Sequence, residues 1–240
     1  MSNPKPIIFK FSLDPYLRID DEEQLAADRT IGKIDQKATI QVAWNAEEAV
    51  RLIEANPHPH AILITDGGIA LPENEHLSRQ VISYAQNGGT VILTLFFATR
   101  TTPKNFNSYM GQWELPWKSI SYKLEECIVN DGAKGRPALI WMRGLPAYYY
   151  SKSALLLNVR HDACWYLTAK FVEYEGYDGK PYQQMRTGSE APIAFTQVGK
   201  GFLGYTGDMI NNDATDAVVL SMLGFNYQVQ WCTCGNEKFA

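Results

Sequence analysis

The sequence has few of the features that mark secreted or membrane-spanning proteins. Its longest apolar run, residues 91–98, has the length of a strand and is broken by Thr94, whereas a membrane span needs about 18 apolar residues. Charged residues between positions 10 and 20 leave the N-terminus without the apolar core of a signal peptide. These two absences predict a cytoplasmic protein without a membrane partner.

Cysteine and histidine are scarce, and their spacing suits neither a disulfide framework nor a metal site. The four cysteines are Cys127, Cys164, Cys232 and Cys234. Their irregular spacing favours free thiols in a reducing compartment. His58 and His60 have no third ligand near them in the sequence, and Cys232-Thr-Cys234 alone offers too few ligands for structural zinc. We therefore predict no metal, no cofactor and no defined role for Cys232 and Cys234.

An excess of basic residues is also absent. Lysine and arginine number 22, aspartate and glutamate number 26, and the formal net charge is −4. A globally basic nucleic-acid binder has the opposite balance, so no nucleic-acid partner is predicted. With 240 residues, of which 45% are hydrophobic and 20% charged, the chain has the size and composition of a single globular domain over residues 1–240.

The first hundred residues alternate between patterns typical of strands and of helices. Asn45 precedes apolar residues at helical spacing and predicts a capped helix over 46–55. Predicted strands cover 7–11, 38–43, 61–65 and 90–95, a second helix covers 74–87 with Gly88 as its cap, and 20–35 is a charged helix or loop. Continuous apolar strands between helices imply a parallel sheet covered by helices. The predicted fold class is α/β, a flavodoxin-like three-layer sandwich with a mostly parallel sheet.

Residues 100–150 differ from both flanks. They are rich in aromatic residues, glycine and proline, and no helical or alternating period runs through them. We interpret them as an aromatic-rich insertion that covers the carboxyl edge of the sheet within the same domain. Beyond it, turn signals at 177–180 and 199–200 predict two β-hairpins, and a closing helix is predicted over 213–223 with Asp213 as its cap.

Several short motifs follow one another in a distinctive order. Ile64-Thr-Asp-Gly-Gly68 precedes a helix and then Asn87-Gly-Gly-Thr-Val-Ile-Leu93. Late in the chain, Ala191-Pro-Ile193 precedes Val198-Gly-Lys-Gly-Phe-Leu-Gly-Tyr-Thr-Gly-Asp208 and the closing helix. In this order the motifs resemble the class I glutamine amidotransferase-like superfamily, above all its trehalose-utilisation-type branch. The resemblance covers residues 38–98 and 190–225.

The resemblance fails where that superfamily's enzymes carry their chemistry. Those enzymes place a cysteine at a strained turn after the third buried strand, which corresponds to residues 90–95 here, and a histidine after the last strand. Here the turn is Thr94-Leu-Phe-Phe-Ala98, and the last strand leads to Gly207-Asp208-Met209. Both the thiolate and its base are missing, which predicts a non-catalytic protein that binds a small molecule or serves in assembly. The expected ligand-binding residues are Asp66, Gly67, Gly68, Phe96, Phe97, Arg100 and Asp208.

Two alternatives remain open. In the first, Asp66 and Asp208 face each other across a pocket as the carboxylates of a hydrolase acting on a sugar-like or small polar substrate. In the second, the aromatic insertion is the interface of a homo-oligomeric structural protein. Simpler interpretations also apply, because Asp-Gly-Gly is an ordinary turn, Asp208 precedes the cap of the closing helix, and arginines such as Arg100 usually lie on the surface. Apolar filling of the turn by Phe96 or Phe97 favours assembly over ligand binding.

Overall fold

The structure is a computed structural model of the protein and describes residues 4–133, 145–175, 180–209 and 211–225. Its strands are β1 (Ile7–Phe11), β2 (Thr39–Ala43), β3 (Ala61–Ile64), β4 (Thr90–Leu93), β5 (Lys118–Val129), β6 (Tyr148–Leu157), β7 (Cys164–Glu175), β8 (Pro181–Thr187), β9 (Ile193–Val198) and β10 (Gly201–Thr206). Its helices are α1 (Asp21–Asp35), α2 (Ala46–Ala55), α3 (Glu75–Gln86), α4 (Phe97–Arg100), α5 (Pro103–Gln112) and α7 (Asp213–Met222). Cys232 and Cys234 lie outside the described residues.

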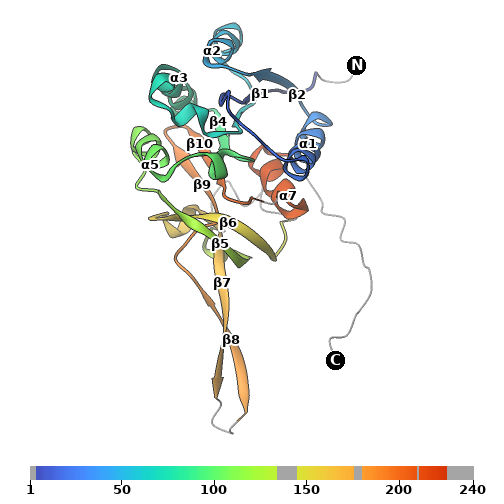
Figure 1. The fold of residues 1–240 in the computed structure, drawn as a ribbon, viewed down its shortest axis with the longest axis vertical. Helices are drawn as coiled ribbons and strands as arrows, with labels where there is room; N and C mark the ends of the chain where they lie inside the picture. The colour runs from blue at the N-terminus through green and yellow to red at the C-terminus, as the bar shows by residue number, and fades with distance from the viewer. Residues whose placement is uncertain (1–3, 134–144, 176–179, 210, 226–240) are drawn as a thin grey trace.

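The strands form one sheet with two halves of different character. The order is β2-β1-β3-β4-β10-β9-β7-β5-β6, and β8 pairs with β7 (Figure 1). Neighbours from β2 to β10 are parallel, and we call these five strands the parallel half. All pairings from β10 onward are antiparallel, and β9, β7, β5, β6 and β8 are the antiparallel half. The predicted α/β class is confirmed, but the described sheet as a whole is mostly antiparallel.

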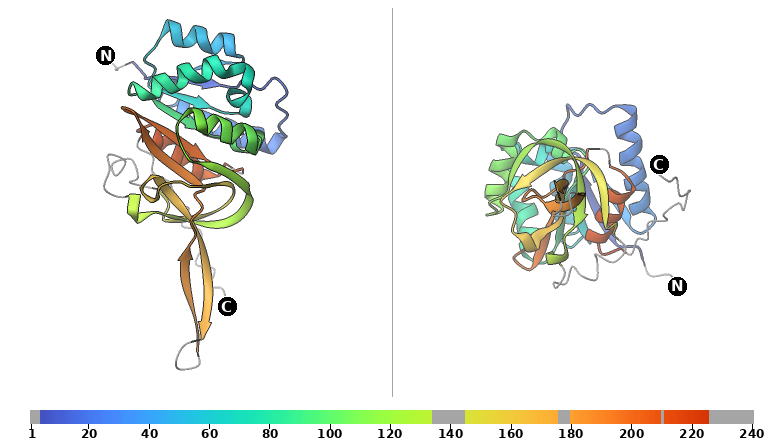
Figure 2. Two further views of the ribbon diagram at one scale, coloured as in Figure 1. Left: turned by 90° about the vertical axis from the view of Figure 1, so that its left-hand side faces the viewer. Right: turned by 90° about the horizontal axis from the view of Figure 1, so that it is seen from below.

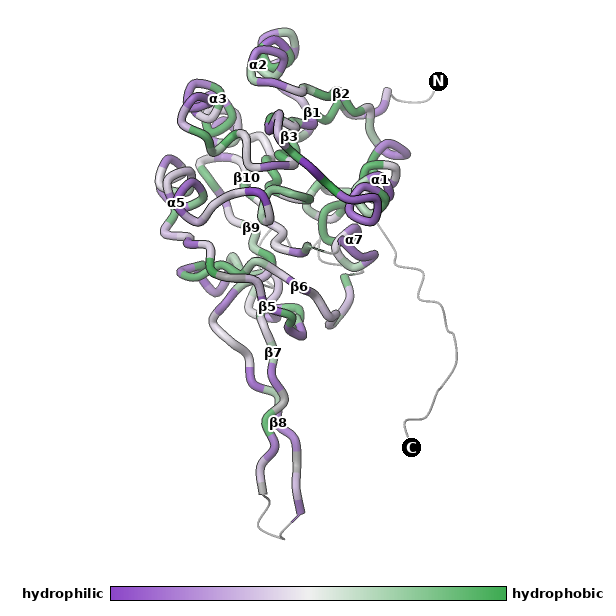
Figure 3. Tube along the Cα trace, in the orientation of Figure 1, coloured by the Kyte–Doolittle hydropathy of each residue, from purple (hydrophilic) through white to green (hydrophobic). Residues whose placement is uncertain are grey.

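Helices cover both faces of the parallel half. Figure 1 shows α3 and α5 on one side and α1 and α7 on the other. Phe9 and Phe11 of β1 pack into the core layer under α2, α3 and α5, while Ile8 packs into the layer that contains Val218 of α7. Because successive side chains of a strand point to opposite faces, a strand covered on both sides is apolar throughout. Figure 3 shows the hydrophobic colours gathered on these strands.

Several helix ends lie where the sequence predicts them. The Asn45 side chain accepts a hydrogen bond from the Glu48 N–H at 2.9 Å and caps α2. Gly88, directly after α3, has a φ of +118°, a conformation that side chains disfavour. The closing helix differs slightly, because its cap is Asn212, whose side chain accepts from Ala214 and Thr215, and Asp213 is its first residue.

A buried ion-pair cluster joins the helices α1 and α7. Asp216 of α7 is fully buried and lies 2.8 Å from Arg29 Nε and 2.6 Å from Lys33 Nζ. The Thr30 hydroxyl also donates to Asp216. Removing a carboxylate from water is costly unless charged partners compensate, so these contacts fix the relative position of the two helices.

The aromatic stretch that the sequence leaves without regular structure forms α5 and two long strands. These strands, β5 and β6, continue the same sheet, and β6 also bridges to the chain beyond β10 through Ser153 and Asp208. The exposures of Tyr148, Tyr149 and Tyr150 explain why no pattern was visible: they are 69%, 7% and 57%, an alternation hidden by three identical residues. The predicted hairpins are confirmed as β7–β8 and β9–β10, and the β7–β8 ribbon projects from the body (Figures 1 and 2).

Over the described ranges, each helix is too short or too polar to cross a lipid bilayer.

Candidate functional site

The turn after β4 contains a residue with positive φ, and that residue is a leucine. Leu95 has a φ of +55°, in the left-handed region that residues other than glycine rarely adopt. The Phe96 N–H donates to Thr65 O at 3.0 Å and the Phe97 N–H to Thr94 O at 3.1 Å, which holds the turn against β3. The short helix α4 starts directly after it. The backbone of this turn is therefore strained at Leu95, within the segment Thr94–Ala98.

Apolar side chains fill the space around this turn. Leu95 is 1% exposed and packs with Phe96 and with Ala27 of α1. Phe97 is fully buried, with its ring centroid 6.0 Å from that of Phe106 and 6.1 Å from that of Tyr109 on α5. The two phenylalanines predicted to bind a ligand are thus placed in the interior, and α1 lies over the turn.

The Asp66-Gly67-Gly68 loop after β3 is also enclosed. Asp66 is fully buried, and its Oδ1 accepts hydrogen bonds from the Gly68 N–H at 2.9 Å and the Asp14 N–H at 3.2 Å. A side chain at Gly68 would lie 2.6 Å from the Leu13 backbone, so only glycine fits beneath this segment. The N–H of Gly68, which could have bound an anion, is already used by Asp66.

Burial shapes the ionisation of Asp66. It raises the pKa of this carboxyl, and the hydrogen bonds from Gly68 and Asp14 oppose the rise only in part. Its second oxygen, Oδ2, has no hydrogen-bond partner among the residues that the structure describes.

Asp208 lies at the end of β10 and joins three elements. It is fully buried, and its Oδ1 accepts from the Ser151 hydroxyl of β6 at 2.7 Å. Its Oδ2 accepts from the Thr215 hydroxyl of α7 and, at 3.4 Å, from the Asn212 N–H. These bonds connect the antiparallel half to the cap of α7.

The contacts of the two candidate catalytic carboxylates do not converge. Asp66 bonds to the segment after β1, whereas Asp208 bonds to β6 and α7. In the sheet β4 lies between β3 and β10, and neighbouring strands are about 4.8 Å apart, so the two strand ends are about 10 Å apart. Arg100, one of the predicted ligand-binding residues, donates from Nη2 to Glu23 of α1 at 2.9 Å and has a side chain that is 35% exposed.

Neither buried thiol has the character of a nucleophile. Burial raises the pKa of Cys127 to about 12 and that of Cys164 to about 11. At neutral pH both are therefore protonated, and the reactive form of cysteine is the thiolate. Cys127 is fully buried and faces Tyr149 across the β5–β6 pair.

Sequence reasoning missed Lys10. It lies within β1, and its Nζ is 4.9 Å from the ring centroid of Trp44, directly after β2. Burial lowers the pKa of Lys10, whereas the charges of Asp66 and Asp28 raise it. A single charge inside an apolar strand was the signal that could have drawn attention to it.

The ring of His60 packs against the residues at the end of α7. His60 Nε2 lies 2.7 Å from Leu223 O, and its ring stacks on Phe225 with centroids 5.3 Å apart. Within the described part of the chain, no cluster of three or more His, Cys, Asp or Glu side chains is placed to hold a metal ion.

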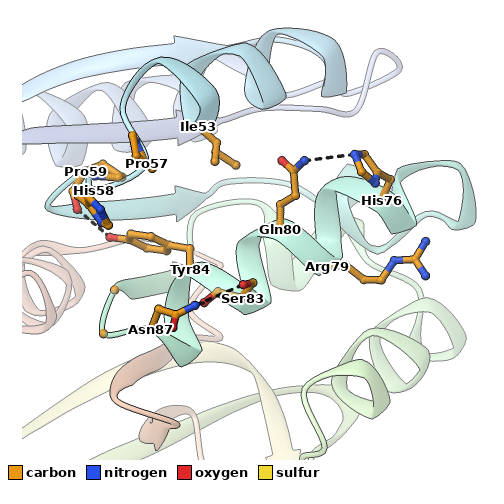
Figure 4. Close-up of a pocket in the computed structure, with 12 residues that line it drawn as sticks. Ile53, Pro57, His58, Pro59, His76, Arg79, Gln80, Ser83, Tyr84 and Asn87 are labelled. Carbon is orange, nitrogen blue, oxygen red and sulfur yellow. Dashed lines mark hydrogen bonds between the residues drawn. The ribbon is translucent and has the colours of Figure 1, made fainter.

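An open groove of about 810 Å³ lies between α2 and α3 (Figure 4). Pro57–Pro59 and Gly88–Gly89 line one end and directly precede β3 and β4, so this end lies at the amino edge of the sheet, opposite the predicted site. Tyr84 donates to Pro59 O at 2.9 Å, and Gln80 lies 3.1 Å from His76 (Figure 4). Gln80 Oε1 is buried and has no partner in the described ranges.

The comparisons with known proteins support a shared fold. No protein-family model matches the chain, and no curated protein is significantly similar to it. Similar solved structures include a ThuA-like protein from Parabacteroides merdae, at 10% identity and a TM-score of 0.52, covering 94% of this chain and 92% of that one. A ThuA-like protein from Bacteroides uniformis has 10% identity, a TM-score of 0.54 and coverages of 92% and 91%. A protein from Salmonella typhimurium LT2, described as cytoplasmic, has 10% identity, a TM-score of 0.51 and coverages of 91% and 98%. The chain therefore shares its fold with ThuA-like (trehalose-utilisation-type) proteins.

Proposed function

We propose that this protein is a non-catalytic, cytoplasmic member of the amidotransferase-like superfamily and that its flavodoxin-like α/β sandwich serves in assembly. One observation carries the proposal: Leu95 occupies the apex of the turn in the left-handed conformation and is 1% exposed. A nucleophile needs an exposed, ionisable group at this position. An apolar side chain packed under α1 offers neither.

The surrounding residues support the absence of catalysis. Phe96 and Phe97 are buried beside the turn, so the place of a substrate is taken by protein. This is the arrangement that favours assembly over ligand binding at the strand ends. A carboxylate-dependent hydrolase would need Asp66 and Asp208 to approach a common point, and their hydrogen bonds lead to different elements.

A turnover assay tests the proposal. The purified chain is incubated with glutamine, p-nitrophenyl esters, short peptides and p-nitrophenyl glycosides, and product is measured against a buffer blank. We expect rates equal to the blank. Turnover that is lost in Asp66→Asn or Asp208→Asn, and kept in the surface variant Asp28→Asn, would overturn the proposal.

A second candidate function is small-molecule binding in the groove between α2 and α3. The groove volume and the unpartnered Gln80 Oε1 favour it, because a buried acceptor without a donor is costly unless a ligand supplies one. A panel of polar metabolites is screened by thermal shift on the wild type and on Gln80→Ala. A rise in the melting temperature that Gln80→Ala abolishes and Glu54→Ala retains supports binding there, and no rise with any compound counts against it.

A further inference from the structure

The β5–β6 pair has one exposed face that is rich in aromatic and aliphatic side chains. The register places Leu124 opposite Lys152, Glu126 opposite Tyr150, and Ile128 opposite Tyr148. Directly opposite residues of an antiparallel pair point to the same face, so these six side chains form one surface. We call it the β5–β6 outer face.

The exposures show that much of this face is open in the described chain: Lys152 is exposed and Glu126 and Ile128 are partly buried, while toward β7 the face continues into the buried Leu167 and Ala169. Leu124, Tyr148 and Tyr150 are 53%, 69% and 57% exposed. Their neighbours on the other face, Cys127 and Ser151, are both fully buried. The strands therefore use one face for the interior and present the other to the surroundings.

Large apolar side chains at this density are unusual on the surface of a monomer. The β5–β6 outer face holds three of the large hydrophobic side chains that are more than a third exposed, and Tyr122 at 42% follows the same alternation along β5. Exposed apolar patches of this kind mark interaction surfaces, and tyrosine is enriched in them.

The charges on this face indicate what covers it. Glu126 and Lys152 lie diagonally on neighbouring strands, two register positions apart on the same face, with the aliphatic and aromatic side chains around them. A partner that offers a base opposite Glu126, an acid opposite Lys152 and an apolar surface around them complements this face. A second copy turned by a two-fold axis offers both, because in a two-fold interface the same patch meets itself.

We propose that the β5–β6 outer face is a two-fold interface between two copies of this chain, with Glu126 of each copy facing Lys152 of the other. The inference rests on the proposed role in assembly and specifies its surface and partner. The strands β5 and β6 lie at the end of the sheet distant from α2 and α3 (Figure 1). The groove between these helices therefore stays open in the dimer.

The experiment measures the molecular mass of the purified full-length chain by light scattering at micromolar concentration. We expect a dimer for the wild type. Glu126→Lys or Lys152→Glu alone places like charges opposite each other and weakens the dimer at least about tenfold. The double variant Glu126→Lys/Lys152→Glu restores opposite charges and the dimer, which an unrelated partner surface would not do.

Two further variants separate the face from the rest of the molecule. Tyr150→Ser removes an aromatic side chain from the outer face and is expected to weaken the dimer. Met185→Ser, a matched change at a 45% exposed residue of the β7–β8 ribbon, is expected to leave it unchanged. Circular dichroism and urea unfolding of each variant confirm that the fold is kept.

The outcomes distinguish the inference from the proposal on which it rests. A wild-type dimer that withstands all the β5–β6 changes overturns this interface and leaves the role in assembly standing. A wild-type monomer overturns both the interface and the role in assembly. Neither result alters the turnover assay, which decides separately whether the protein is catalytic.

Discussion

The parallel and antiparallel halves of the sheet use their two faces differently. In the parallel half, β3 is buried at all four residues and helices cover both sides. In the antiparallel half, β6 alternates between exposed and buried residues from Tyr148 to Ser153. A strand covered on two sides contributes only to the core, whereas a strand covered on one side has a face left for recognition. The open face of β6 is therefore where a partner can pack directly on the sheet, whereas on β3 the helices occupy both faces.

The largest effect should come from truncating one aromatic ring in each half. Phe97→Ala removes a fully buried ring that packs on Phe106 and Tyr109 and should lower the free energy of unfolding by about 3–5 kcal/mol. Tyr148→Ala removes a ring that is 69% exposed and should lower it by less than about 0.5 kcal/mol. Urea unfolding at a concentration where the chain is monomeric measures both. Equal losses would contradict the distinction between the two halves.

A smaller effect is expected from removing one charge in each half. Asp216→Asn leaves Arg29 and Lys33 without their buried carboxylate and should cost about 2 kcal/mol, less than a fully buried pair because both cations are partly exposed. Lys123→Met breaks a partly exposed pair with Glu190 in the antiparallel half and should cost less than about 1 kcal/mol. Thermal and urea unfolding of both variants provide the comparison. A larger loss for Lys123→Met would reverse the expected order.

The left-handed turn at the edge of the parallel half can be examined with a matched pair. Leu95→Ala and Leu95→Gly both remove the buried side chain, but only glycine adopts a φ of +55° without steric cost. The glycine variant should therefore be more stable than the alanine variant by about 1 kcal/mol. At an ordinary helical position such as Glu54, the same comparison should favour alanine. If alanine is also favoured at position 95, the turn is not left-handed in solution.

The smallest expected effects are those of pH on the free energy of unfolding. One carboxyl in each half should make stability change with pH, in opposite directions. Burial raises the pKa of Asp66, so the folded state holds this proton more tightly, and stability falls as pH rises from the unfolded value of about 3.9 through the raised pKa. The Lys123 ammonium lowers the pKa of Glu190, so that contribution is present above the unfolded value of about 4.3 and is lost as pH falls through the lowered pKa.

Substitution of each carboxyl by its amide tests these signs. Urea midpoints are measured at a series of pH values on both sides of the unfolded carboxyl pKa of about 4. Asp66→Asn should remove a decline of stability toward high pH, and Glu190→Gln should remove a decline toward low pH. Two variants with the same pH profile as the wild type would show that neither carboxyl is coupled to folding.

Much of the parallel half could be predicted because its local signals agree with its tertiary structure. The cap at Asn45 and the apolar spacing after it predict α2 with the observed bounds, and the run Ala61–Thr65 predicts β3 to within one residue. The antiparallel half was harder to predict. β5 and β6 pair over a long stretch of chain, and their tyrosines occupy both the buried and the exposed positions, so hydropathy carries no period.

In the candidate site, too, features set by adjacent residues could be predicted, whereas contacts between residues far apart in the sequence could not. The turn after β4 and the loop at Asp66 follow from local strand ends and were placed correctly along the chain. The residues that cover them were not predictable. Ala27 and Glu23 belong to the segment 20–35, which the sequence left as either helix or loop, and Leu13 precedes that segment in a stretch with no predicted element. Lys10 escaped attention for a similar reason, since its partners Asp28 and Trp44 come from separate elements.

The turn at Leu95 has a consequence for protein engineering. In α/β-hydrolases the nucleophile sits on a sharp, strained turn between a strand and a helix. Here the bend exists and tolerates a leucine, so a cysteine at position 95 would inherit the geometry without a change of loop. A substrate would reach position 95 only after Phe96 is replaced by a smaller residue and the side chains of α1 that lie over the turn are made smaller. The protein is thus a scaffold into which a covalent catalytic residue can be introduced by single substitutions.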